Sequence, residues 1–344
     1  MNHNRLDPTR AMNALTSWPL GELMRLAHVR RTQYHPGNQV TWVFDTNPNH
    51  TNICQTRCSF CAFWRDEKTG YTLTPDQLVT RLSPAIHQGA TTILIQGGHN
   101  PAITLADWVT LIRTLTHAFP KVHLHPFSPP EIVFMAQTEK TTTQHILATL
   151  WEEGIRTLPG GGAEVLSDNI RKKISPLKCS ATQWLELMEQ AHLMGFKTTA
   201  TLMYGHIETP NDLINHLMAL RALQDRTGGF SSFVPWSFKP GDTPLGRRII
   251  QSTIPIDYLR IIATARLVLD NVSHIQSSWF SEHWSVGQLG LLAGADDFGG
   301  LLFEEHVLQQ AGHAPRSNKE RVLHAIRGMG FEPVQRDSLY RPVT

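Results

Sequence analysis

Two patterns of apolar positions recur along this chain, one typical of helices and the other of strands. Apolar side chains from Trp108 to Phe119, and again from Tyr258 to Leu269, recur every three or four residues, which predicts helices that bury one face. Thr74-Pro75-Asp76 predicts a further helix start, with Thr as the cap and Pro in the first turn. Short β-rich runs lie between the helical segments and predict strands at 40–44, 91–96, 122–127, a run ending at 158, 198–204, 231–236, 274–278 and 295–298.

Strands that alternate with helices form parallel sheets through right-handed crossovers. The eight predicted strands therefore indicate an α/β fold, a (β/α)8 barrel of the TIM type. No internal repeat, low-complexity tract or linker divides the 344 residues. We expect one barrel domain over residues 39–330, an N-terminal helical extension at 1–38 and a C-terminal tail at 331–344.

Composition and charge exclude several classes of protein. The chain is 41% hydrophobic and 17% charged, as in ordinary globular proteins. Its 31 Lys+Arg and 29 Asp+Glu leave a net charge of +2, and the basic residues are scattered, so we expect no nucleic-acid partner. The sequence has neither an apolar run long enough for a membrane span nor a signal peptide at its start, so we expect no membrane association and a cytoplasmic location.

Three of the four cysteines form a compact motif. Cys54, Cys58 and Cys61 have the spacing C-x3-C-x2-C, whereas Cys179 stands alone. Three thiolates in one loop suit an iron–sulfur cluster, and a [4Fe–4S] cluster held by three of them keeps one iron open to another ligand. A zinc site completed by His50, or three buried structural thiols, are the alternatives.

The loops that follow the predicted strands are polar, as expected of a barrel whose active site lies at the C-terminal ends of its strands. Gly97 and Gly98 follow the second strand and would let the backbone approach a ligand closely. Glu164, after the fourth strand, can accept hydrogen bonds from a ribose or an ammonium group, and Arg171 can pair with a carboxylate.

The cysteine spacing, with Phe60 just before the third Cys, resembles the signature of radical S-adenosylmethionine (SAM) enzymes. This resemblance implies a [4Fe–4S] cluster held by Cys54, Cys58 and Cys61, whose open iron binds SAM, and cleavage of SAM to a 5′-deoxyadenosyl radical. It also implies a reductant such as flavodoxin or ferredoxin. The residues expected to contact the cofactors are Phe60, Gly97, Gly98, Ser128, Glu164, Arg171 and Glu208.

Longer segments, among them 96–101, 128–132 and 158–164, resemble the dehypoxanthine futalosine cyclase family of menaquinone biosynthesis. That resemblance implies abstraction of a ribose hydrogen from a small-molecule substrate, addition of the carbon radical to an aryl ring, and loss of a proton to a base. Asp297 and Glu304 are the candidate bases, with His283 or His306 as further possibilities. The expected substrate-binding residues are His50, Trp64, Trp236, Gln276, Trp279 and Asp296, with Phe238 and Phe298 as further apolar walls.

Several positions depart from the pattern expected of these cyclases. His50 and Trp64 stand where Tyr is expected, and Asp296 stands where Asn is expected. Such changes alter the hydrogen bonds that would recognise a substrate. Two alternatives therefore stay open: a related radical SAM enzyme that acts on a different nucleoside or aryl substrate, and a redox-sensing iron–sulfur protein without turnover.

Overall fold

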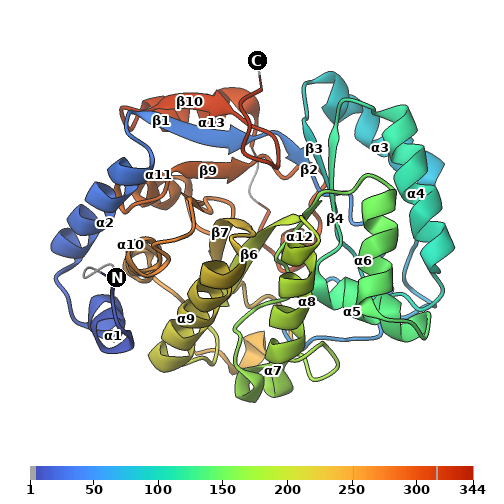
Figure 1. Ribbon diagram of the computed structural model, residues 1–344, viewed down its shortest axis with the longest axis horizontal. Coiled ribbons are helices and arrows are strands. Elements are labelled where there is room, and N and C mark those ends of the chain that lie inside the picture. The colour runs from blue at the N-terminus through green and yellow to red at the C-terminus, as the bar shows by residue number, and fades with distance from the viewer. Residues whose placement is uncertain (1–4, 251, 315–316, 344) are drawn as a thin grey trace.

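The computed structural model describes residues 5–250, 252–314 and 317–343. Its strands alternate with helices, and the helices surround them (Figure 1). The strands are β1 (Gln39–Val43), β2 (Asp45–Thr46), β3 (Thr92–Ile95), β4 (His123–Pro126), β5 (Thr157–Leu158), β6 (Lys197–Tyr204), β7 (Phe230–Ser237), β8 (His274–Ile275), β9 (Asp297–Gly300) and β10 (Glu332–Gln335).

The helices are α1 (Pro8–Thr16), α2 (Leu20–Tyr34), α3 (Pro75–His87), α4 (Leu105–Ala118), α5 (Pro129–Thr138), α6 (Thr143–Glu152), α7 (Asp168–Ile174), α8 (Ala181–Leu193), α9 (Pro210–Thr227), α10 (Pro255–Val268), α11 (Trp284–Leu292), α12 (Val307–Gln310) and α13 (Lys319–Arg327), with a short 3-10 helix at Gly246–Arg248. Thr74 caps α3 in a reciprocal box with Gln77, as the sequence indicates. Gly228 ends α9 with φ 60° in the left-handed region.

All strand pairings are parallel, in three sheets of order β10-β1-β9, β2-β3-β4 and β5-β6-β7-β8. β2 continues the course of β1, so β1 and β2 together act as the first barrel strand. The α/β barrel expected from the sequence is confirmed, and the eight predicted strands match β1 through β9 within a few residues.

Two joints in this barrel lack a continuous ladder within the described residues. Between β8 and β9 the pairing is the isolated bridge Gln276↔Asp297, with hydrogen bonds from Asp296 N–H to Ile275 O and from Ser277 N–H to Asp297 O. Between β4 and β5, side chains join the strands, because the Thr157 hydroxyl lies 2.7 Å from His123 Nε2 and 2.7 Å from His125 Nδ1. The β4–β5 edge of the four-stranded sheet β5–β8 therefore depends on side-chain hydrogen bonds, whereas backbone hydrogen bonds join its β8 edge to β9.

Residues 331–344, expected to follow the barrel as a tail, take part in it as far as they are described. β10 pairs with β1, and the chain then crosses the N-terminal end of the cylinder. The Arg336 carbonyl accepts a hydrogen bond from Thr91 at the start of β3, and Tyr340 stacks on His274 at the start of β8 with ring centroids 3.8 Å apart. This segment forms a floor beneath the strands.

Candidate active site

A cavity of about 390 Å³ runs through the barrel from the cysteine loop to the floor formed by Arg336, Ser338 and Tyr340. Non-glycine residues with positive φ, among them Asn49 and Glu164, line this cavity. Such conformations cost free energy and collect at functional sites. The cavity is therefore the candidate active site.

All three cysteines of the motif are free thiols that line the cavity. Their loop is held at both ends, because Cys54 N–H donates to Arg65 O at 3.1 Å and Cys61 N–H donates to Cys58 O at 3.1 Å. Burial raises the pKa of Cys58 to about 12. A bound cation would therefore be needed to hold this sulfur as a thiolate.

The geometry disfavours a mononuclear zinc site. In tetrahedral zinc sites the Zn–S bonds of about 2.3 Å place the ligand atoms about 4 Å apart. Within the described residues, the only group of three His, Cys, Asp or Glu ligand atoms that all lie within 4.8 Å of one another is His35, His274 and Asp296. The three thiols of the motif do not form such a group.

His50 lies outside the cavity lining, contrary to its expected roles as a substrate contact and a possible zinc ligand. It is buried edge-on against Trp108, with ring centroids 4.7 Å apart, and neither ring nitrogen has a hydrogen-bond partner. Burial lowers the pKa of His50 to about 3, so the ring is a neutral packing element.

Gly97 and Gly98 line the cavity, but the lack of side chains serves the packing of two loops. A Cβ on Gly97 would overlap the His50 ring, and a Cβ on Gly98 would overlap the Ile53 carbonyl oxygen. Gly98 N–H also donates to Thr51 O at 2.8 Å. The two glycines therefore allow the loop after β3 to pack closely against the segment that leads into the cysteine loop.

Ser128 lines the cavity, as expected, and is tied to Glu131. The Ser128 N–H and hydroxyl donate to Glu131 Oε2 at 2.7 and 2.6 Å, and Gly97 N–H donates to Oε1 at 3.1 Å. Burial raises the pKa of Glu131 despite these hydrogen bonds. Glu131 thus connects the loops after β3 and β4.

A buried ion pair joins Glu164 to Lys178 at 2.6 Å in the cavity wall. Burial disfavours the charge of Glu164, but Lys178 and Arg171 outweigh it and hold the pKa of the carboxyl below its usual value. The Lys178 ammonium also lies 5.3 Å from the centroid of the Phe60 ring, which lines the cavity as expected. Sequence reasoning did not single out Lys178, because its partners come from two distant loops.

Arg171 and Glu208, expected to contact cofactors, are instead used within the scaffold, and neither lines the cavity. Arg171 is buried and donates to the carbonyl oxygens of Gly162, Ala163 and Cys179. Glu208 accepts hydrogen bonds from Gly205 N–H and His206 N–H in its own loop. Both side chains shape loops at the mouth.

Of the expected substrate-binding aromatics, Trp64 and Trp236 line the cavity, and so does Gln276. Trp279 does not: it is buried and stacks on Trp284 with centroids 4.2 Å apart. Phe238 and Phe298 also belong to the core and lie outside the lining.

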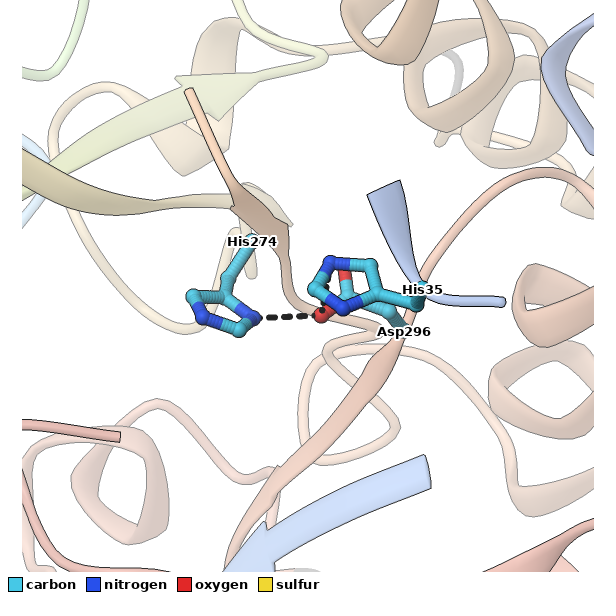
Figure 2. Close-up of side chains that lie close together, drawn as sticks. All are labelled: His35, His274 and Asp296. Atoms are coloured by element: carbon cyan, nitrogen blue, oxygen red, sulfur yellow. Dashed lines mark hydrogen bonds and ion pairs between the residues drawn. The ribbon is translucent and has the colours of Figure 1, made fainter. Parts of the chain in front are cut away.

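Asp296 belongs to a buried network rather than to the substrate cavity (Figure 2). Its carboxylate contacts the Arg266 guanidinium, lies 2.6 Å from His274 Nδ1 and 3.2 Å from His35 Nε2, and accepts Ile275 N–H. Burial opposes its charge, but Arg266 and the two histidines hold the pKa of Asp296 well below its usual range. The guanidinium already supplies a cation, so hydrogen bonding accounts for this cluster without a metal.

The two acids expected as bases do not line the cavity. Asp297 makes a two-pronged pair with Arg336 at 2.5 and 2.9 Å and also accepts the Thr41 hydroxyl at 2.6 Å. Glu304 is half-buried and pairs with Arg81 and His306. His283 and His306 lie outside the lining as well.

The carboxylates that do line the cavity are Asp45, Glu131, Glu164 and Glu305. Asp45 lies on β2 and is 5% exposed. Burial raises the pKa of Asp45 to about 6. Asp45 directly follows the run predicted as the first strand, and only the three-dimensional arrangement shows that it lines the cavity.

Comparison with known proteins identifies the family. Residues 48–220 match the radical SAM superfamily, and residues 227–344 match the CofH/MqnC C-terminal region. The chain belongs to the radical SAM superfamily. The cofactors of this family are a [4Fe–4S] cluster and SAM.

The chain is 37% identical to the cyclic dehypoxanthine futalosine synthase of Streptomyces coelicolor, over 98% of this chain and 85% of that protein. It is also 37% identical to the 5-amino-6-(D-ribitylamino)uracil–L-tyrosine 4-hydroxyphenyl transferase of Methanothermobacter thermautotrophicus, over 96% and 91%. The crystal structure of methylornithine synthase superposes with a TM-score of 0.77 at 19% identity, over 96% of this chain and 95% of that one, which supports the fold.

The helices were also compared with the length and hydropathy that a bilayer span requires. Within the described residues, none is long and apolar enough to cross a membrane.

Proposed function

We propose that this radical SAM enzyme converts dehypoxanthine futalosine to its cyclic product, by ribose hydrogen abstraction and closure onto the aryl ring. The observation that carries the proposal is the placement of three free thiols at the mouth of one enclosed cavity. The similarity to the cyclic dehypoxanthine futalosine synthase of Streptomyces coelicolor supports this substrate.

In this proposal Cys54, Cys58 and Cys61, which all line the cavity, hold the cluster. When bound, the reduced cluster and SAM supply a 5′-deoxyadenosyl radical. Lys178 and Glu164 place a fixed charge pair beside the cysteine loop, where the polar end of a zwitterionic ligand can be bound.

The rest of the cavity orients the substrate and excludes water. Trp64 and Trp236 provide apolar walls, and Gln276 provides an amide for the ribose or carboxylate. The floor of Arg336, Ser338 and Tyr340 closes the far end. Holding both halves of one molecule in such an enclosure favours ring closure over quenching of the radical.

The test is anaerobic reconstitution with iron and sulfide, followed by reduction and addition of SAM and dehypoxanthine futalosine. The expected results are 5′-deoxyadenosine and a product two hydrogen atoms lighter than the substrate, since the reaction removes one hydrogen atom, one proton and one electron. Cys58→Ala should abolish both, whereas Cys179→Ala is the matched control, because Cys179 is buried outside the cavity. A cluster-binding redox sensor would release no 5′-deoxyadenosine.

A second candidate is the transfer of a tyrosine-derived 4-hydroxyphenyl group to 5-amino-6-(D-ribitylamino)uracil. The 37% identity to the Methanothermobacter transferase, equal to that of the cyclase, favours testing it. Product masses obtained with each substrate set decide between the two reactions.

A further inference from the structure

This inference rests on the proposed function and concerns the proton that the reaction must remove. After the ribose carbon radical adds to the aryl ring, the ring-centred radical regains aromaticity by losing the hydrogen at the attacked carbon as a proton, together with one electron. A base must therefore face the cavity. Asp297 and Glu304 lie outside the lining and are paired with arginines.

Of the four carboxylates that line the cavity, three are engaged. Glu131 accepts hydrogen bonds on both oxygens, and Glu164 is paired with Lys178. Glu305 accepts the N–H groups of Val307 and Leu308 at the start of α12. A proton on any of them would weaken contacts that hold the wall together.

Asp45 is different. Within the described residues, its carboxylate accepts one hydrogen bond from another residue, which Leu302 N–H donates to Oδ1 at 2.8 Å. Asp45 lines the cavity and keeps a small exposed surface, 5% of the residue.

The fold fixes this carboxylate in place. Asp45 pairs in register with Thr92 at the start of β3, within the barrel wall. A Cβ on Gly300 would overlap both carboxylate oxygens, so the absence of a side chain there provides the space for them. A carboxylate fixed in this way keeps a constant position relative to a ring bound in the cavity.

The surrounding charges suit proton transfer near neutral pH. Burial raises the pKa of Asp45, the nearby Arg336 lowers it and Asp297 raises it, for a net value of about 6. At pH 7.5 the group is therefore mostly ionised, yet it is a stronger base than an exposed carboxylate.

We propose that Asp45 is the catalytic base that takes the proton from the cyclised ring radical. The C–H bond at the attacked ring carbon breaks, its proton moves to Asp45, and one electron leaves to a one-electron carrier of the flavodoxin or ferredoxin class. The remaining electrons of that bond rejoin the aromatic ring, so atoms and electrons balance.

The experiment compares wild type, Asp45→Asn and Asp45→Glu in the reconstituted protein with SAM and dehypoxanthine futalosine. Loss of a general base costs about 10²- to 10⁴-fold in rate. Asp45→Asn should lose cyclised product by at least about 100-fold yet still release 5′-deoxyadenosine, and a substrate-derived radical should accumulate in its electron paramagnetic resonance spectrum. Asp45→Glu should recover part of the product. Glu304→Gln is the matched control, because this acid lies outside the cavity lining.

A measurement on the wild type alone guards against misfolding of the variants. The ratio of cyclised product to 5′-deoxyadenosine should fall as the pH decreases through about 6, the value to which burial raises the pKa of Asp45. Full product formation by Asp45→Asn, or a wild-type ratio independent of pH from 5 to 8, would overturn the assignment of Asp45 alone. Absence of cyclised product in the wild type, with 5′-deoxyadenosine still released, would instead overturn the proposed substrate.

Discussion

The buried pair between Lys178 and Glu164 gives the most quantitative prediction. Their side chains are only 15% and 4% exposed, so water screens them little. Lys178→Met would leave the Glu164 carboxylate in the wall without its nearest cation. Breaking a buried pair in this way costs about 3–5 kcal/mol, and the neighbouring Arg171 places the expected cost near the lower end, about 3 kcal/mol.

This free-energy cost corresponds to a measurable decrease in melting temperature. With an unfolding entropy of roughly 2.1 cal/mol/K per residue, a chain of 344 residues should lose about 4 °C in melting temperature. Thermal unfolding of the apoprotein, followed by circular dichroism, measures it. The double variant Lys178→Met/Glu164→Gln removes both charges and should recover most of the loss.

The control is the surface pair Arg113–Glu153, in which the arginine side chain is 69% exposed. Arg113→Met should leave the melting temperature nearly unchanged. A melting temperature of Lys178→Met equal to that of the wild type would contradict this cost, and so would a double variant no more stable than Lys178→Met.

Other predictions concern acid stability, loop packing and the tryptophans. The pKa of Asp296 is lower in the folded protein than in the unfolded chain. The ionised carboxylate therefore stabilises the fold fully above about pH 4, and this stabilisation is lost as the pH falls towards the pKa of the folded state. In Asp296→Asn, the urea midpoint of unfolding should vary less with pH in this range. Gly98→Ala would drive a methyl into a carbonyl of the cysteine loop and should lower cluster absorbance after reconstitution, whereas Gly21→Ala, with open space around it, should keep the absorbance unchanged. Trp279→Ala should cost about 3–5 kcal/mol in urea unfolding, whereas Trp236→Ala should mainly raise KM; equal stability losses would contradict this division.

Local patterns in the sequence predicted the barrel strands and the cysteine loop, because a hydrophobic period and a ligand spacing are properties of neighbouring residues. They could not predict which acids face the cavity. Asp297 lies near the end of its predicted strand, where a base could face the active site, yet its carboxylate pairs with Arg336, 39 positions away. Lys178 reached the site only because the loops after β5 and before α8 fold together.

The side-chain joint between β4 and β5 bears on how the enzyme could admit its ligands. At one edge the sheet β5–β8 meets β4 through the Thr157 hydroxyl, whereas at the other edge backbone hydrogen bonds join β8 to β9. Each such hydrogen bond contributes only about 1 kcal/mol, so we expect the β4–β5 edge to open more easily than the ladders within the sheet. The cysteines lie on one side of this edge and Trp236 on the other, so we expect its opening to change the distance between the cysteine loop and Trp236 across the cavity.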